Sequence, residues 1–336
     1  MKVLLLGSHI SYNLEHYVYM NLKRLGCEVK FCGYKKTLGR LATPMRMAIS
    51  RSRIIRRVMN SIYLNKINDE VRRLAESYSP DLVLSIKGES ITPKTIEWLR
   101  RKLAAKAALW YPDDPRFFNS LAEQVAQHYD YVFTASEKAI GMYSRIGVKS
   151  VHWLPFGCEP SVHRRIQLSE EDVRKYKCDV CFVGSYTRRR APIIGALERS
   201  GVRVGVWGPY WKLFKYDGNV HQSLNGPEMV KAFNAAKIVL NIHTNEDLRF
   251  KANMRTFEAA GSRSFLLTDK PVDLERHFRV GKDVAVYDDE TDLVESAKYY
   301  MDANEERENM ALRAQERAYR EHTYQDRLTA LLRSIE

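Results

Sequence analysis

Short apolar runs alternate with segments of helical periodicity along most of the chain. The first run ends at Gly7, and a helical pattern follows over about residues 14–25. The strand-like segments of the first half are 2–7, 28–33, 81–88, 107–112, 129–136 and 150–157. This alternation predicts a mostly parallel sheet with helices on both faces.

The alternation starts again after a polar connection. Residues 158–177 are polar, and we interpret them as a link between domains. Further strand-like segments are 178–185, 203–208, 236–243, 264–269 and 283–289, and a charged helical tail begins near Leu293. We therefore predict an α/β protein with two Rossmann-like domains facing across a cleft, an N-terminal domain over 1–160 and a C-terminal domain over 176–318.

The composition indicates a folded globular chain. Of 336 residues, 45% are hydrophobic and 28% are charged. We expect neither a signal peptide nor a transmembrane segment, because no apolar run is long enough. The five scattered cysteines favour a reducing compartment. Cys178 and Cys181 have CxxC spacing, but we interpret them as buried strand residues. We expect a cytoplasmic protein, with peripheral attachment to a membrane as an open alternative.

Basic residues are concentrated near the N-terminus. The formal net charge is +13, and between Lys35 and Arg73 eleven basic residues stand against two acidic ones. Such a field attracts an anionic membrane surface, nucleic acid or another anionic acceptor. Residues 45–64 interleave arginines with apolar residues at helical spacing. This pattern fits either a core-facing helix with a solvated basic face or a surface that meets an anionic partner.

A candidate phosphate site follows the first strand-like run of the second domain. Gly184 and Ser185 form a small-residue turn, which leads through Arg188 and Arg190 to Pro192 near a helix start. Free backbone N–H groups and guanidinium groups bind phosphate. A solvated basic turn is the structural alternative.

A second candidate group begins at His243, which ends an apolar run and is either a donor contact or a structural histidine. Asn253 is suited to cap a helix that continues with Met254 and Arg255, and Glu258 comes one turn later. Arg255 is unfavourable for the helix dipole but favourable for an anionic ligand. Glu258 has the chemistry to bind a ribose diol, or it forms a surface ion pair with Arg255.

Two adjacent carboxylates follow an apolar strand of the first domain. Asp113 and Asp114 stand between Pro112 and Pro115, which keep the loop extended. One of them is suited to take a proton from an acceptor hydroxyl or to stabilise a departing glycosyl group. Adjacent residues point in different directions, so we expect only one to face the cleft. Capping of local backbone is the alternative role.

Candidate acceptor contacts come after the first strand. Ser8, His9, Tyr12 and Asn13 lie there, although a plain turn explains them as well. No metal-ligand spacing occurs in the chain, and we expect that a diphosphate held by arginines and helix ends needs no metal.

Several of these segments together resemble one family. Residues 240–269 (LNIHTNEDLRFKANMRTFEAAGSRSFLLTD), 178–190 (CDVCFVGSYTRRR), 321–332 (EHTYQDRLTALL) and 109–118 (LWYPDDPRFF) are similar to the CgeB-like (spore maturation protein) glycosyltransferases. These proteins are related to the group 1 transferases and have the GT-B fold. The resemblance runs through nearly the whole chain, and its most specific parts are NMRTFEAAG and YPDDP.

The resemblance implies a nucleotide-sugar donor bound mainly by the second domain. Glu258 would bind the ribose, and the helix opened by Asn253, Met254 and Arg255 would meet the diphosphate. A final helix over about 319–336 would pack back on the first domain. Many group 1 transferases carry a further Glu near the donor sugar, where this chain has Phe250.

We therefore expect a glycosyltransferase that moves a sugar from a nucleoside-diphosphate-sugar to a hydroxyl of a glycan, lipid, protein or modified nucleic acid. A nucleotide-sugar epimerase of the same fold and a basic nucleic-acid-binding protein are the alternatives.

Overall fold

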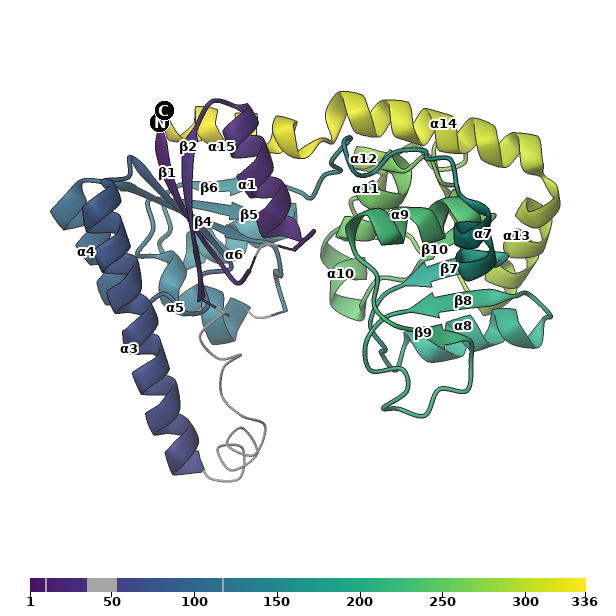
Figure 1. The fold of residues 1–336 in the computed structure, drawn as a ribbon, viewed down its shortest axis with the longest axis horizontal. Helices are drawn as coiled ribbons and strands as arrows, with labels where there is room; N and C mark the ends of the chain where they lie inside the picture. Colours follow the sequence, from purple (N-terminus) through teal and green to yellow (C-terminus); the bar gives the residue numbers. More distant parts are fainter. Residues whose placement is uncertain (10, 35–52, 117) are drawn as a thin grey trace. The chain divides into compact units, whose positions relative to one another are not determined.

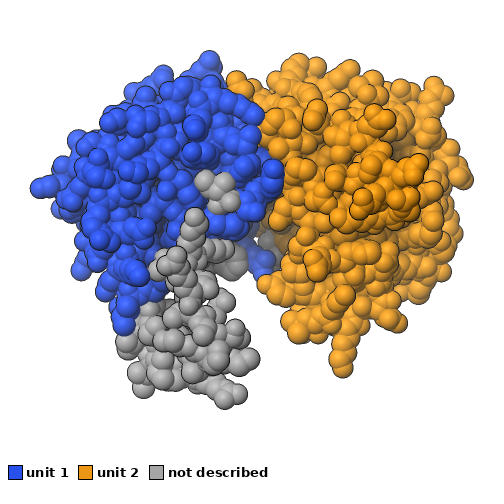
Figure 2. All heavy atoms as spheres, viewed as in Figure 1, with its two compact units in different colours: residues 1–154, 328–336 blue, residues 155–327 orange. Residues whose placement is uncertain are grey.

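The computed structural model describes residues 1–9, 11–34, 53–116 and 118–336. It divides into two compact units, one of residues Met1–Leu154 with Leu328–Glu336 and the other of residues Pro155–Arg327 (Figure 2). The polar connection that we interpreted as a link between domains thus belongs to the second unit. The last residues of the chain belong to the first.

A six-stranded sheet in the order β2-β1-β3-β4-β5-β6 forms the centre of the first unit (Figure 1). Its strands are β1 Lys2–Gly7, β2 Glu28–Gly33, β3 Leu82–Ile86, β4 Lys106–Tyr111, β5 Tyr131–Thr134 and β6 Val151–Trp153. Neighbouring strands pair in parallel, with Leu5 opposite Phe31 on one side and Leu84 on the other. The strand order reverses between β1 and β3, which makes this point the expected ligand site of the sheet.

Helices cover both faces of this sheet, as its buried strands require. They are α1 Leu14–Arg24, α3 Arg53–Tyr78, α4 Pro93–Leu103, the π-helix η2 Phe118–Ala122, α5 Glu123–Ala126, the 3-10 helix η3 Glu137–Ala139 and α6 Ile140–Arg145. The core between helices and strands includes Val71, Leu99 and Tyr143. Of the predicted basic helix over 45–64, residues 45–52 lie outside the described part, and α3 begins at Arg53.

The second unit contains a six-stranded sheet in the order β12-β11-β10-β7-β8-β9 (Figure 1). Its strands are β7 Val180–Val183, β8 Val204–Trp207, β9 Val220–His221, β10 Ile238–Asn241, β11 Leu266–Thr268 and β12 Ala285–Val286. All described pairings are parallel. This is the Rossmann order, and it reverses between β7 and β10.

One helix of the second unit, α7, precedes its first strand, and the others follow strands. They are α7 Glu170–Tyr176, α8 Arg190–Arg199, α9 Gly226–Ala235, α10 Asn245–Phe250, α11 Met254–Gly261, α12 Leu274–His277, α13 Glu290–Asp302 and α14 Asn304–Glu321. The last helix, α15 Tyr324–Ile335, crosses from the second unit into the first. In the first unit, the Nζ of Lys106 donates a hydrogen bond to the carbonyl of Ile335.

The prediction of an α/β protein with two Rossmann-like domains is confirmed. Each predicted strand-like segment contains a strand, whereas β9 was not predicted because Val220 is the only apolar residue in the polar stretch 217–223. The supposed link is held in the second unit by backbone pairing: the N–H of Cys158 donates to His322 O (2.8 Å), and that of Tyr324 donates to Cys158 O (2.9 Å). Among the described residues, no helix has the length and apolar character needed to cross a membrane.

Candidate functional site

Three of the predicted donor residues directly follow the two strands at the switch point of the second sheet. Gly184 and Ser185 follow β7, and His243 follows β10, so they lie at the same edge of the sheet. The loop after β8 is pinned to this edge, because the indole N–H of Trp211 donates to Gly184 O (2.8 Å). A Cβ on Gly208 would lie 1.9 Å from the same carbonyl oxygen, so only glycine fits there.

Arg190 joins the ends of the two switch-point strands. Its Nε donates to Ile242 O (2.9 Å) after β10, and its Nη1 donates to Ser185 O (3.0 Å) after β7. Burial lowers the pKa of Arg190 to about 10, so the group remains a cation at neutral pH. Its charge lies beside the turn, while its N–H groups are largely occupied by backbone carbonyls.

The other two arginines of this turn differ in surroundings. Arg188 is exposed. Arg189 pairs with Asp269 (Nη1 to Oδ2, 2.7 Å) and donates to His243 O (2.7 Å). Of the three, Arg188 has the guanidinium most accessible to a ligand.

His243 is fully buried and orients the start of α11. Its Nδ1 lies 2.5 Å from Asp269 Oδ1, and its Nε2 accepts the backbone N–H of Asn253 (3.1 Å). These partners place the ring proton on Nδ1. Burial alone would raise the pKa of Asp269, but the contacts with His243 and Arg189 outweigh it and lower that pKa. His243 thus acts on the site through Asn253.

Asn253 caps α11, as the sequence predicts. Its Oδ1 accepts the backbone N–H of Thr256 (3.4 Å), and its side chain exchanges hydrogen bonds with that of Asn241 at the end of β10. Met254, the first residue of the helix, is partly exposed. The helix N-terminus is therefore fixed at the switch point, where its dipole favours an anion.

Arg255 and Glu258 form an ion pair on α11, the structural alternative weighed above. The Nε of Arg255 also donates to Val183 O (3.1 Å), which ties this pair to the end of β7. The Glu258 side chain is 1% exposed and that of Arg255 is 27% exposed. The pair is thus a buried carboxylate covered by a more accessible guanidinium, unlike a surface pair.

His163 approaches Glu258 from the other side and was missed in the sequence. Its Nε2 lies 3.8 Å from Glu258 Oε1, and its Nδ1 accepts the N–H of Glu159 (2.9 Å), so the proton is on Nε2. Burial lowers the pKa of His163. Next to it, a Cβ on Gly261 would come within 2.8 Å of the Cβ of Cys158, which explains the small residue there.

A second buried ion pair precedes α11. The Nζ of Lys251 lies 2.6 Å from Asp247 Oδ1, and the lysine side chain is 4% exposed. Burial would raise the pKa of Asp247, but Lys251 and Thr244 lower it. The i,i+4 spacing was the only signal of this pair in the sequence.

The candidate acceptor residues lie at the switch point of the first sheet. Ser8 follows β1 and is buried; its Oγ donates to Glu15 Oε1 (2.7 Å) and lies 3.0 Å from the Nδ1 of His9. Asn13 caps α1 by accepting the N–H of His16 (3.1 Å). Tyr12 is 41% exposed. Glu15 is a buried carboxylate that the sequence reading did not assign.

Asp113 and Asp114 point in different directions. Asp114 is fully buried and accepts the hydroxyls of Thr134 (2.6 Å) and Tyr143 (2.9 Å). Asp113 is 31% exposed, and its Oδ2 lies 2.5 Å from the Nζ of Lys87, the residue after β3. Asp114 therefore supports the loop from inside, and Asp113 presents a carboxylate at the sheet edge.

Lys87 has an unusual backbone conformation. Its φ is 65°, and Gly88 follows with a φ of 66°. Positive φ in a residue with a side chain costs free energy and is concentrated at functional sites. Burial would lower the pKa of Lys87, but Asp113 raises it overall.

No cluster of three or more histidine, cysteine or acidic side chains suited to a metal ion occurs in the part of the chain that the structure describes. All five cysteines are free and buried.

Comparisons with known proteins agree with this architecture. Residues 188–333 match the family described as glycosyl transferase-like. The chain is 25% identical to the spore protein CgeB of Bacillus subtilis (strain 168) over 278 residues, which cover 77% of this chain and 84% of CgeB.

Solved structures are similar over the whole length. Anabaena HepE in complex with UDP and glucose has a TM-score of 0.67 at 12% identity, with 100% of both chains covered. Sucrose-phosphate synthase from Thermosynechococcus elongatus has a TM-score of 0.65 at 10% identity, covering 99% of this chain and 98% of that one. The DNA-modifying β-glucosyltransferase has a TM-score of 0.60 at 13% identity, covering 100% and 99%. With its two Rossmann-like sheets, the chain has the GT-B fold; it is similar to CgeB and matches the glycosyl transferase-like family over residues 188–333.

Proposed function

We propose that the enzyme uses a uridine diphosphate sugar and binds it at the β7–β10 edge of the second unit. The observation that carries this proposal is the capped N-terminus of α11 beside Arg255, Arg190 and the buried Glu258. Helix N-termini and guanidinium groups neutralise a diphosphate. HepE was solved with UDP and with UDP-glucose, which supports uridine as the base.

In this proposal Arg255 and Glu258 bind different parts of the donor. With no donor, Arg255 neutralises Glu258, which is otherwise a buried charge with large desolvation cost. When the diphosphate binds, Arg255 turns to it, and one oxygen of Glu258 becomes available to the ribose hydroxyls. Arg188 and Ser185 add contacts to the phosphates, and His243 keeps the helix start in place through Asn253.

Asp113 is the proposed proton acceptor in the first unit. The bond between the anomeric carbon and the phosphate oxygen breaks, the acceptor oxygen bonds to that carbon, and the acceptor proton moves to Asp113. Lys87 pairs with Asp113 and positions its carboxylate. Ser8, His9, Tyr12 and Asn13 are the proposed acceptor contacts.

The arginines and the helix N-terminus take the role of a metal ion in this proposal. Donor binding is then expected to be equally strong in excess EDTA and in added Mg²⁺. A marked rise in donor affinity with Mg²⁺ would contradict it.

The basic side chains of the first unit are proposed to attract an anionic acceptor or surface. Some of them lie on α3 and α4, which line two grooves that share Trp98 and also contain Asp69, Glu76 and Glu97; the basic residues there are Lys66, Arg72, Arg73, Lys94, Arg101 and Lys102. Attraction of this kind weakens as salt screens the charges. If the protein instead binds nucleic acid without transferring a sugar, its binding to nucleic acid should weaken with salt in the same way. Substitution of Glu258 should then leave that binding unchanged.

Thermal unfolding with a panel of nucleoside diphosphates and their sugars tests the donor site. A ligand at a hundred times its Kd should stabilise the protein by about 2.7 kcal/mol. We expect UDP and a UDP-sugar to stabilise the wild type and to lose most of this effect with Glu258→Gln. Glu295→Gln, an exposed position on α13, is the matched control. No stabilisation by any nucleotide would overturn the proposal, as would equal stabilisation of the Glu258→Gln variant.

Conversion of the donor distinguishes transferase from epimerase. A transferase releases UDP from the donor in the presence of acceptor and slowly with water. An epimerase changes the sugar of the donor without releasing UDP.

A further inference from the structure

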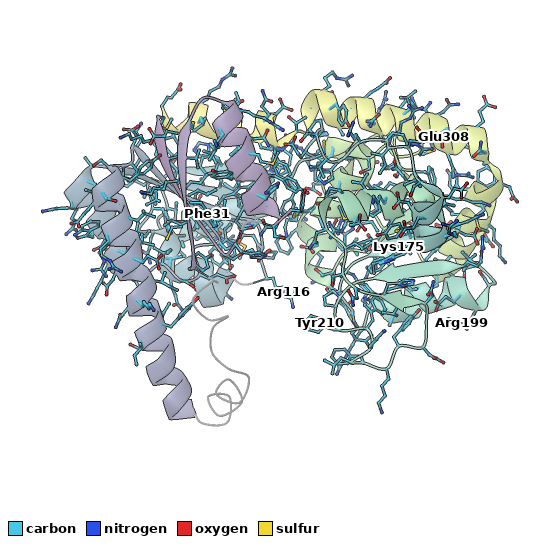
Figure 3. All side chains as sticks on the ribbon, viewed as in Figure 1. Phe31, Arg116, Lys175, Arg199, Tyr210 and Glu308 are labelled. Carbon is cyan, nitrogen blue, oxygen red and sulfur yellow. The ribbon has the colours of Figure 1, made fainter. Side chains whose placement is uncertain are left out.

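Three large apolar side chains are exposed together in the connection between β8 and β9. Tyr210 is 60% exposed, Leu213 is 73% exposed and Phe214 is 58% exposed. This connection leaves the second sheet as a loop (Figure 1), and Figure 3 labels Tyr210 there. The other large exposed apolar residues of the described chain are scattered. Grouped exposure of this kind marks an interaction surface.

The loop holds these side chains outward on a fixed base. Trp211, between them, is fully buried and bonded to Gly184 O (2.8 Å). The N–H of Phe214 donates to Tyr210 O (3.1 Å), which closes a turn. The ring of Phe214 stacks on Tyr186, with centroids 4.5 Å apart and an angle of 12° between the planes. The apolar tip is thus preorganised, which lowers the entropic cost of binding a partner.

The charges of the same segment fit an anionic partner. Lys212 and Lys215 are exposed and flank Leu213, and residues 209–216 contain no acidic residue. Aromatic and aliphatic tips flanked by lysines are typical of segments that enter the interface of an anionic bilayer, where lysines meet lipid headgroups.

We propose that Tyr210, Leu213 and Phe214 insert into the interface of an anionic lipid bilayer, with Lys212 and Lys215 on its headgroups. A bilayer fits better than nucleic acid, because the most exposed member is the aliphatic Leu213, which neither stacks on bases nor binds phosphate. The docking surface lies beside the proposed donor loop, since Trp211 and Tyr186 connect the two. The acceptor is then a molecule held at that membrane, and this last step rests on the proposed function.

Sedimentation of the full chain with lipid vesicles tests the docking. We expect binding to vesicles of phosphatidylcholine and phosphatidylglycerol in equal parts, and much weaker binding to phosphatidylcholine alone. Leu213→Ser with Phe214→Ser should reduce the partition coefficient at least about tenfold. Lys212→Gln with Lys215→Gln should reduce it by about fivefold per lysine, on anionic vesicles only.

Val272→Ser removes an exposed apolar side chain elsewhere in the unit and should leave vesicle binding unchanged. Unaltered melting temperatures show that each variant is folded. Equal binding by wild type and the Leu213–Phe214 variant would overturn the proposal. So would no binding to anionic vesicles, a dimer that the variant abolishes, or DNA binding that depends on the same residues.

Stabilisation by UDP, measured without vesicles, separates the two proposals. Vesicle binding without a nucleotide response leaves the docking surface standing and removes the donor site. A nucleotide response without vesicle binding supports the donor site and removes the docking surface.

Discussion

The switch points of the two sheets have similar architecture and opposite chemistry. At the edge of the second sheet, four arginines (Arg188, Arg189, Arg190 and Arg255) accompany two buried carboxylates, Asp269 and Glu258. At the edge of the first sheet, Asp113 pairs with Lys87, and Glu15 and Asp114 are buried carboxylates. One edge is suited to a charged diphosphate and the other to a hydroxyl that must lose a proton.

The two edges also differ in what their buried hydrogen bonds support. In the second, the bonds among His243, Asp269 and Asn253 fix the start of α11, whereas in the first the hydroxyls of Thr134 and Tyr143 hold Asp114. In the first, Lys87 and Asp113 are each about a third exposed, at 35% and 31%. Binding of a large anionic donor requires a preorganised site, whereas a proton acceptor needs access to solvent and substrate.

Asp113→Asn gives the largest expected effect. Loss of a general base lowers rates by about 10² to 10⁴-fold, and donor affinity should stay the same because the residue lies in the other unit. Release of UDP from the donor measures the rate, and the thermal shift with UDP measures binding. Asp302→Asn, an exposed position, serves as the control. Retention of more than a tenth of the wild-type rate would remove Asp113 from the mechanism.

Arg255→Gln should weaken UDP binding by about ten- to a hundredfold, because a charge-assisted hydrogen bond to phosphate is lost. Uridine, which has no phosphate, should bind the variant as it binds the wild type. Calorimetric titration of the wild type and the variant with each ligand gives the ratio of their Kd values for UDP and for uridine. Arg199→Gln, at the far end of α8, is the matched control (Figure 3). An equal loss for uridine and UDP would show that Arg255 supports the site without touching phosphate.

The sequence predicted the positions of the strands more completely than it predicted which side chains contact one another. Apolar runs and their spacing determine strands, so the alternation identified every strand except the two-residue β9. Asn253 was predicted as a cap because capping depends on local sequence. The contacts of Glu258 with His163, and of Asp113 with Lys87, join residues distant in the chain. Such pairs have no periodic signal, and only the fold brings them together.

Asp114→Asn should lower the free energy of unfolding by about 1–3 kcal/mol, because the buried carboxylate accepts the hydroxyls of Thr134 and Tyr143. Urea unfolding measures the change. Asp113→Asn is the natural comparison, since the same substitution one residue earlier affects a partly exposed side chain. Equal losses of stability in the two variants would contradict the separation of their roles.

Acid should destabilise the second unit through His322. Burial lowers the pKa of His322 to about 3, and its Nδ1 accepts a hydrogen bond from Arg327 (2.8 Å). In the unfolded state a histidine has a pKa of about 6.5, so below that pH the unfolded state binds more protons than the folded state. The free energy of unfolding therefore falls by up to about 1.4 kcal/mol per pH unit until the pH reaches the pKa of the folded state. His322→Gln should flatten this slope in urea unfolding between about pH 6.5 and 4. An unchanged slope would show that His322 is not the group that titrates.

Lys87→Met should have the smallest effect, because the Lys87–Asp113 pair is partly exposed and solvent screens it. Removal of the ammonium leaves the Asp113 carboxylate without its ion-pair partner and therefore less firmly positioned. The expected change in kcat is a few-fold at most, and Lys87→Arg should restore the rate.

Melting temperature and donor affinity separate positioning from structural support. If Lys87 only stabilised its left-handed turn, Lys87→Met would lower the melting temperature together with kcat. A lower kcat with an unchanged melting temperature and an unchanged donor affinity, restored by Lys87→Arg, means that Lys87 acts by holding Asp113 in place. In that case the contrast between the two edges extends to their cations, because the arginines of the second unit are proposed to bind the donor, whereas the lysine of the first positions the proton acceptor.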